Sequence, residues 1–235
     1  MPCMIIVGGF WGDEGKGKMV SYLALKDECT VAARGGVGPN AGHSVLWRGK
    51  TYGLRMLPCA FVNPKTHLLI GPGVLVNPQV FSKEIQETGA EARSGLDSLC
   101  AIIEQKHIDQ DRNSEHLRGK IGTTGTGTGP CNADRVNRLV KVARDFPELK
   151  SYLIDVPLMV NEALSRGENV LLEGTQGTFL SLFHGSYPFV TSKDVTASSI
   201  AADVGVGPTN VDEVVVVFKA YVTRVGEGLL KGELS

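Results

Sequence analysis

The chain has 235 residues, 42% of them hydrophobic, which suffices for one domain with a substantial core. The 24 basic and 25 acidic residues nearly cancel. The net charge therefore gives no indication of a nucleic-acid partner or of an anionic membrane surface. Five scattered cysteines form no CxxC pair, which argues against a disulfide framework or a zinc cluster and favours a reducing, cytoplasmic setting. No apolar run is long enough to span a bilayer, and the N-terminus does not resemble a signal peptide.

Strands and helices are predicted to alternate along the chain. A helix begins at Pro78, behind Asn77 as its cap, and is closed by Gly89. The other predicted helices cover 16–26, 134–144, 152–166 and 196–203, and the predicted strands cover 4–8, 30–33, 44–47, 50–54, 68–70, 100–103, 169–172 and 214–221. This alternation predicts a single α/β domain over 1–235, with a mostly parallel central sheet flanked by helices.

Several glycine-rich loops follow the predicted strands. Loop 9–17 follows the first strand, loop 35–43 the second and loop 173–177 a later one, whereas loop 122–129 is harder to place. Ligands of open α/β sheets collect at the carboxyl ends of the strands. We therefore expect these loops to converge on one site of nucleotide size.

The loop 9–18 has the parts of a phosphate-binding turn without the usual motif. Phe10 stands where a Walker A loop has its first glycine, and Gly17 replaces the usual Ser or Thr. The other features of a phosphate-binding turn are present: Lys16, a flexible backbone and the start of a helix. They favour phosphate binding over the alternative, a glycine turn with solvated charges. Asp13 would repel a bare phosphate, which indicates a bound metal ion or a general base beside a nucleotide.

The other three loops are ambiguous when each is taken alone. His43 fits a general acid or a phosphate contact, but equally a surface histidine, and Asn40 fits a turn. The alternating Gly and Thr of 122–129 suit a phosphate monoester or a flexible linker. Gln176 fits a hydrogen bond to a purine edge or an ordinary turn after a strand.

Taken together and in this order, the segments resemble the adenylosuccinate synthetases. The resemblance runs from residue 2 to the end, and Gly36–Pro39 and the short connections are similar to the compact, archaeal-type members. It is carried by 11–18, 40–43, 121–125, 173–177, 187–191 and 223–226. That family has a fold like that of the P-loop NTPases. It joins IMP to L-aspartate in AMP biosynthesis, using GTP and Mg²⁺ and a 6-phosphoryl-IMP intermediate.

The resemblance implies a role for each matching residue. Asp13 would remove the N1 proton of IMP and would also bind Mg²⁺, with the Gly42 carbonyl as a second Mg²⁺ ligand. His43 would be the acid that stabilises the charge on the departing β-phosphate. Arg138 would reach the IMP phosphate of the neighbouring subunit of a homodimer. The residues implied for GTP are Gly12, Glu14, Gly15, Lys16, Gly17, Lys18, Gly42, His43 and Ser44. Those implied for IMP are Asp13, Lys16, Asn40, Ala41, Thr124, Gln176, Thr191 and Arg138.

The chain departs from the family pattern after residue 226. Members of the family continue with an arginine-rich loop for aspartate and a Lys-x-Asp for guanine, and neither occurs here. One hypothesis is therefore the N-terminal catalytic portion of the enzyme. A second is a shortened, inactive relative that binds nucleotides and dimerises, and a third, disfavoured by the failed Walker A spacing, is a generic GTPase or small-molecule kinase. A related phage branch that acts on a 2-amino purine nucleotide has Ser at the position of Asp13, so Asp13 favours IMP.

Overall fold

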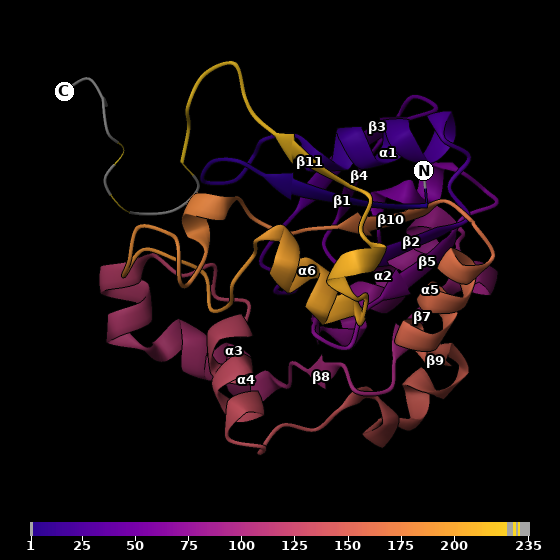
Figure 1. Ribbon diagram of the computed structural model, residues 1–235. Coiled ribbons are helices and arrows are strands. Elements are labelled where there is room, and N and C mark those ends of the chain that lie inside the picture. Colours follow the sequence, from indigo (N-terminus) through magenta and orange to yellow (C-terminus); the bar gives the residue numbers. More distant parts are fainter. Residues whose placement is uncertain (1, 225–227, 229, 231–235) are drawn as a thin grey trace.

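A computed structural model describes residues 2–224, 228 and 230 of the chain. Its centre is a seven-stranded sheet in the order β11-β1-β10-β2-β5-β7-β9, in which every pair of neighbours is parallel (Figure 1). Its strands are β1 (Cys3–Gly8), β2 (Val31–Arg34), β5 (His67–Ile70), β7 (Ser94–Asp97), β9 (Leu153–Ile154), β10 (Val170–Glu173) and β11 (Glu213–Val217). The hairpin β3 (His43–Trp47) and β4 (Lys50–Leu54) and the pair β6 (Leu75–Val76) and β8 (Ala101–Ile102) lie outside this sheet.

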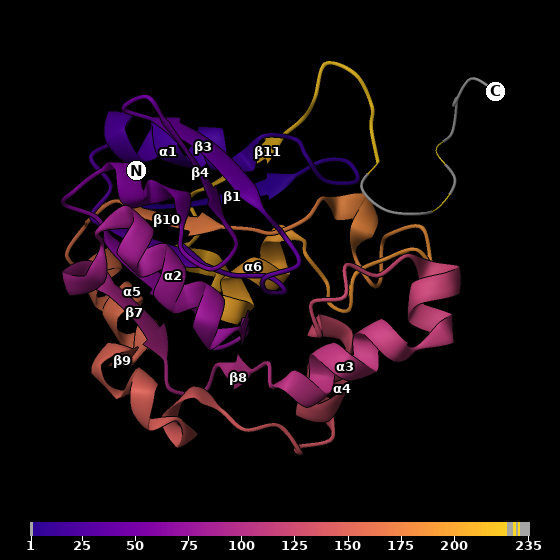
Figure 2. The ribbon, with the colours of Figure 1, turned by 180° about the vertical axis from the view of Figure 1, so that it is seen from behind.

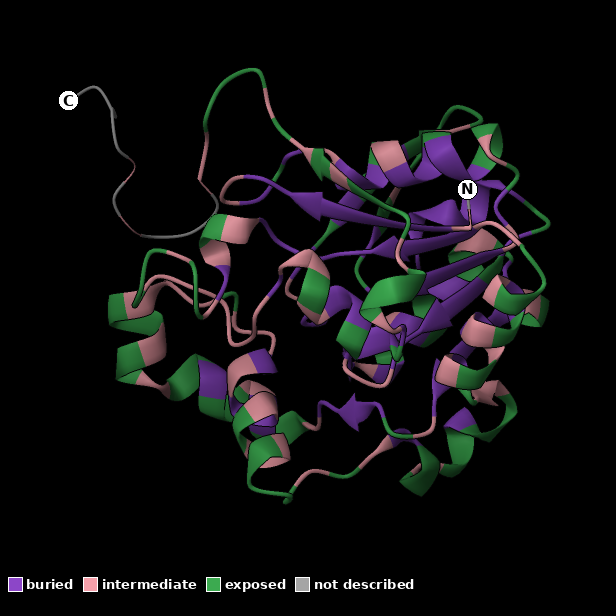
Figure 3. Ribbon diagram, in the orientation of Figure 1, coloured by how far each residue is buried: buried purple, intermediate pink, exposed green. Residues whose placement is uncertain are grey.

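Helices cover both faces of the sheet. The helices α1 (Lys16–Lys26) and α2 (Pro78–Thr88) lie on one face, and α5 (Val156–Ser165) and α6 (Ala197–Val204) lie on the other, whereas α3 (Gln105–Asn113) and α4 (Thr128–Val136) cover neither face. Met4 and Ile6 of β1 pack with α1 and α2 in one core, whereas Ile5 and Val7 pack with α5 and α6 in the other. The apolar run of β1 is continuous because the strand is buried on both faces, as are β2 and β10 (Figure 3).

The helices α3 and α4 pack against each other to one side of the sheet, as both views show (Figures 1 and 2). A small third core, which includes Val37, Cys131 and Val195, joins them to the loops that leave the strands. Between α3 and α4 the chain makes a π-helical turn, Leu117–Ile121. No helix among the described residues is long and apolar enough to cross a bilayer, and all five cysteines are free and buried.

The predicted α/β fold with a mostly parallel sheet is confirmed, but three predicted elements are wrong in extent. The helix predicted at 134–144 is α4, which begins at Thr128 and ends at Val136. Pro130 is tolerated because it lies in the first turn, where no intrahelical bond needs its N–H. Beyond α4, Arg138 has a φ of 62°, in the left-handed region, which ends the helix.

The helix predicted at 152–166 is shorter because its first residues form the edge strand β9. The Asp155 carboxylate accepts the Leu158 N–H and so caps α5, which starts only at Val156. The strand predicted at 214–221 ends at Val217. The short strand β7 and the helix α3 were not predicted. The sequence of α3, QKHIDQDRN, has no apolar stripe, so nothing in its periodicity indicates a helix.

Candidate functional site

One cavity of about 530 Å³ lies where the loops after β1, β2 and β10 meet the segment between α3 and α4. Among the described residues, it gathers every residue that the sequence assigned to a nucleotide site except Arg138. These are Gly12, Asp13, Glu14, Gly15, Lys16, Gly17, Lys18, Asn40, Ala41, Gly42, His43, Ser44, Thr124, Gln176 and Thr191. The predicted convergence of the four loops is therefore found, including that of loop 122–129, whose Gly122, Thr123, Thr128 and Gly129 also line the cavity.

The turn between β1 and α1 holds Asp13 in an uncommon backbone conformation. Asp13 has a φ of 56° between Gly12 at 95° and Gly15 at 93°. Its carboxylate is exposed and has no hydrogen bond to any described residue. No side chain caps the N-terminus of α1, so its first backbone N–H groups are open to an anion in the cavity.

The neighbouring Glu14 folds back into the same turn. Its buried carboxylate accepts the backbone N–H groups of Phe10 (3.1 Å) and Gly12 (2.8 Å) and the Lys16 ammonium (2.7 Å). Burial alone would raise the pKa of Glu14, but Lys16 and the backbone donors outweigh it and hold the pKa below its usual range. A phosphate group that binds Lys16 must therefore share its ammonium with Glu14 or displace the carboxylate.

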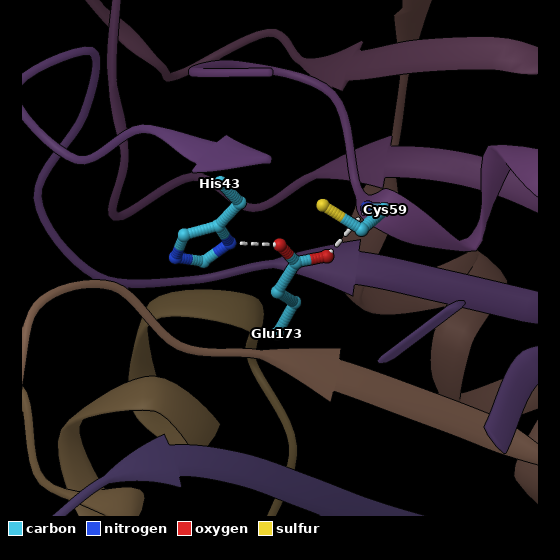
Figure 4. Close-up of side chains that lie close together, drawn as sticks. All are labelled: His43, Cys59 and Glu173. Atoms are coloured by element: carbon cyan, nitrogen blue, oxygen red, sulfur yellow. Dashed lines mark hydrogen bonds and ion pairs between the residues drawn. The ribbon is translucent and has the colours of Figure 1, made fainter. Parts of the chain in front are cut away.

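His43 lies beside Glu173 and Cys59 (Figure 4), and Arg34 completes this buried cluster. The Nδ1 atom of His43 lies 2.5 Å from Oε1 of Glu173, and Arg34 Nη1 lies 2.8 Å from the same oxygen. The other carboxylate oxygen accepts the Cys59 N–H at 2.6 Å. Burial alone would raise the pKa of Glu173, but Arg34 and His43 hold it at about 2. Burial, helped by the Arg34 cation, lowers the pKa of His43 to about 4, so its ring is neutral at pH 7.

His43, Cys59 and Glu173 also bring three potential metal-ligand atoms within 4.8 Å of one another. However, Arg34 already supplies the positive charge that balances Glu173. Burial raises the pKa of the Cys59 thiol well above its usual value, so it carries no negative charge to attract an ion. We therefore interpret the cluster as a hydrogen-bonded support for His43 rather than as a metal centre.

Several buried polar atoms around the cavity have no hydrogen-bond partner among the described residues. They are Asn40 Oδ1, His43 Nε2, Gln176 Oε1 and Nε2, and Ser192 Oγ. A buried polar atom without a partner costs about 1–3 kcal/mol. Asn40 Nδ2 also donates to Thr191 Oγ1 at 3.2 Å, which joins two residues that the sequence assigned to IMP. These atoms form a polar surface that a ligand with donors and acceptors on its edge would satisfy.

The loop 122–129 is held by Asp111, a residue of α3 that the sequence did not point to. One oxygen of the buried Asp111 carboxylate accepts the Thr123 hydroxyl, and the other accepts the Gly127 N–H, both at 2.8 Å. Arg224, from the segment 223–226, also lines the cavity and donates to the Phe189 carbonyl at 2.8 Å. Val225 and Gly226 of that segment lie outside the described residues.

Two oxygen groups in the cavity suit a magnesium ion. The Asp13 carboxylate and the Gly42 carbonyl both come from its lining, and Mg²⁺ prefers oxygen ligands. One carboxylate is enough where phosphates and water complete the octahedron. The unpartnered carboxylate of Asp13 therefore fits a metal-bound triphosphate.

Arg138 lies apart from this cavity. It lines a second hollow of about 520 Å³ together with Gly73, Asn132, Arg135, Val136, Lys193 and Asp203. Val136 and Leu139, on either side of it, are each 68% exposed. An arginine in this place does not reach the first cavity of its own chain.

Comparison with known proteins identifies the family. A family model described as adenylosuccinate synthetase matches residues 5–146 and 139–235. The chain is 60% identical over 234 residues to the adenylosuccinate synthetase of Archaeoglobus fulgidus and 58% identical over 238 residues to that of Methanocaldococcus jannaschii. Both matches span the whole chain and 69% of the relative.

Comparison with solved structures leads to the same family. The chain matches a fully ligated adenylosuccinate synthetase from Plasmodium falciparum with a TM-score of 0.89 and 26% identity, over 98% of this chain and 65% of that one. It matches the succinoaminodeoxyadenylate synthetase of cyanophage S-2L, bound to dGMP and dATP, with a TM-score of 0.80 and 26% identity, over 92% of this chain and 64% of that one. The chain thus spans 69% of those two curated relatives and just under two thirds of these two structures. It belongs to the adenylosuccinate synthetase family.

Proposed function

We propose that this chain carries the part of an adenylosuccinate synthetase that binds IMP, the GTP triphosphate and Mg²⁺ and transfers the phosphoryl group. The observation that supports this most strongly is the single cavity shared by Asp13, His43 and loop 122–129. Unpartnered buried polar atoms of Asn40 and Gln176 beside it suit the edge of a purine nucleotide. GTP-dependent joining of IMP and aspartate is the function of the family to which the chain belongs.

In this proposal Asp13 removes the N1 proton of IMP, which makes the 6-oxygen nucleophilic enough to attack the γ-phosphate. His43 presents Nε2 to the oxygen that leaves with the β-phosphate. Lys16 and the N–H groups at the start of α1 neutralise the triphosphate, because phosphoryl transfer depends mainly on positioning and charge stabilisation. Magnesium, held by Asp13 and Gly42, would supply further positive charge to the phosphates. Aspartate then displaces the 6-phosphoryl group.

Aspartate binding and guanine recognition are assigned to the part of the relatives that lies outside the match. The chain spans 69% of the Archaeoglobus fulgidus relative. Two chains test the proposal. One is the 235-residue chain, and the other is a fusion of this chain with the part of the Archaeoglobus fulgidus relative outside the match. Adenylosuccinate formation by the fusion supports the proposed enzymatic function.

We place the reaction in the cytoplasm, since five free, buried cysteines fit a reducing compartment.

Calorimetric titration tests the nucleotide site directly. We expect IMP to bind the 235-residue chain, and Asn40→Ala to weaken that binding about tenfold, the equivalent of one lost hydrogen bond. Lys65→Ala, an exposed change outside the cavity, is the matched control and should leave the affinity unchanged. Absence of any binding heat with IMP, both alone and with GTP and Mg²⁺, would contradict the proposal.

A homodimer is proposed through the surface around Arg138. The exposed Val136 and Leu139 are apolar and flank this arginine, which lies in a hollow that also contains Arg135 and Lys193. Leu139→Asp is expected to shift the chain toward monomer in sedimentation equilibrium, because it places a charge in the apolar contact. Leu158→Asp, on α5 and similarly exposed, is the control. Equal association of both variants and the unmodified chain would argue for another interface.

A further inference from the structure

We propose that Glu173, backed by Arg34, is a positioning residue that keeps the proton of the His43 ring on Nδ1 and so presents Nε2 to the cavity. The inference rests on the proposed function, because it concerns the reaction to which His43 contributes. The sequence assigned no role to Glu173, the first residue of the segment 173–177. Its contacts give it a definite task.

The register of the sheet brings the cluster together. Glu173 and Arg34 are the last residues of β10 and β2, and they are opposite each other in the parallel register. His43 is the first residue of β3, the strand that follows the loop after β2. Because parallel strands end at a common edge, two residues separated by 139 positions in sequence form an ion pair beside the cavity.

The hydrogen-bond pattern determines which atom carries the ring proton. Glu173 already accepts N–H groups from Arg34 and Cys59, so it behaves as an ionised carboxylate, which can only accept. An oxygen and a nitrogen 2.5 Å apart would repel each other without a hydrogen between them. Arg34 Nη1, which can only donate, also lies 3.2 Å from Nδ1, but the carboxylate contact is much shorter. We therefore assign the hydrogen to His43 Nδ1, and the neutral ring has its lone pair on Nε2.

The surroundings also hold the backbone and the Cβ atom of His43 in place. Arg34 Nη2 donates to the Ala41 carbonyl at 3.1 Å and so ties down the loop just before His43. On the other side, a Cβ atom built at Gly17 would lie 2.9 Å from His43 Cβ and 3.0 Å from Cys59 Sγ. The helix α1 thus packs directly against the histidine. His43 lines the cavity, and its Nε2 atom is buried and has no hydrogen-bond partner among the described residues.

The chemical consequence is that the His43 ring contacts the substrate through a single atom, Nε2. Since Nδ1 donates to Glu173, any proton that His43 exchanges with a phosphate oxygen is carried by Nε2, and the neutral resting ring must first take up a proton there before it can act as an acid. Loss of the carboxylate would allow the other tautomer, in which Nε2 is protonated in the resting ring and Nδ1 is not. Partners that fix the tautomer of a metal-binding histidine contribute about 10–100-fold to affinity or activity, and we expect an effect of that order for Glu173.

The first test needs no catalysis. Histidine ring ¹⁵N chemical shifts of the labelled 235-residue chain, with His43 assigned by its loss in His43→Asn, report which nitrogen is protonated. We expect a protonated Nδ1 and an unprotonated Nε2 in the unmodified chain, and a shift toward the other tautomer in Glu173→Gln. A resting ring protonated on Nε2 in the unmodified chain would overturn the inference, whether or not the variant folds.

The second test is kinetic and uses the fusion described above. Glu173→Gln is expected to lower kcat about 10–100-fold while KM for IMP changes by less than about twofold, because the residues assigned to IMP are untouched. Asp97→Asn is the matched control. Asp97 is a buried carboxylate that also ends a parallel strand, and it accepts the Leu99 and Val156 N–H groups outside the cavity.

The outcomes separate this inference from the proposed function. An inactive fusion of the unmodified sequence, with the expected tautomer, would count against the proposed function and leave the positioning of His43 standing. An active fusion in which Glu173→Gln retains full kcat would reject the role of Glu173 alone. Equal losses of kcat in Glu173→Gln and Asp97→Asn would also reject it, since that result indicates general structural damage.

Discussion

Asp13→Asn is expected to lower the turnover of the fusion about 10²–10⁴-fold, the usual contribution of a general base. The amide of asparagine cannot accept the N1 proton of IMP, and it is a weaker ligand for Mg²⁺ than a carboxylate. The change keeps the size of the side chain, and asparagine tolerates the left-handed backbone of this position. The measurement is the initial rate of adenylosuccinate formation at saturating IMP, GTP and aspartate.

Two comparisons make this result specific. Glu28→Gln is the matched control, because Glu28 is an exposed carboxylate with a φ of 47° that lies outside the cavity. It should retain full turnover. IMP affinity of Asp13→Asn in calorimetry should stay within about tenfold, since a lost base affects the transition state more than binding. Near-normal turnover of Asp13→Asn would reject its assignment as the base.

The elements that the sequence predicted well are those with local signals at both ends. For α2, Asn77 accepts the Val80 N–H, Pro78 occupies the first turn, and Gly89 adopts the left-handed conformation with a φ of 63°. All three are recognisable from residue type, because each solves a problem of the nearby backbone. The hairpin 43–54 was recognisable for the same reason, with Arg48 and Gly49 both at positive φ in its turn.

The supporting contacts of the site could not be predicted in this way. Glu173 and His43 are 130 positions apart, and nothing in either local sequence indicates the other. Asp111 lies on a helix without an apolar stripe and binds a loop 12 to 16 positions away. Such pairs depend on sheet order and on the packing of α3, which single-sequence patterns do not contain. Asp13 was recognisable, in contrast, because a carboxylate inside a glycine-rich turn is itself unusual.

Glu84→Ala is expected to lower the free energy of unfolding by about 3–5 kcal/mol. Glu84 on α2 is only 3% exposed, and its carboxylate accepts three successive backbone N–H groups, those of Arg55 (2.6 Å), Met56 (2.9 Å) and Leu57 (2.8 Å). Each buried donor left without a partner costs about 1–3 kcal/mol, and partial hydration of the new space offsets some of the sum. Urea denaturation of the 235-residue chain measures the loss.

Glu87→Ala, one turn further along α2, is the control for the loss of a glutamate from this helix. Its pair with Lys83 is exposed, so the free energy of unfolding should change by less than about 0.5 kcal/mol.

The segment held by Glu84 leads directly to Cys59, whose N–H binds Glu173. Glu84→Ala should therefore also loosen the support of His43, which the ring ¹⁵N shifts would reveal as a mixture of tautomers. A loss below about 1 kcal/mol would mean that water replaces the carboxylate at these three donors, and the segment would then owe its position to packing alone.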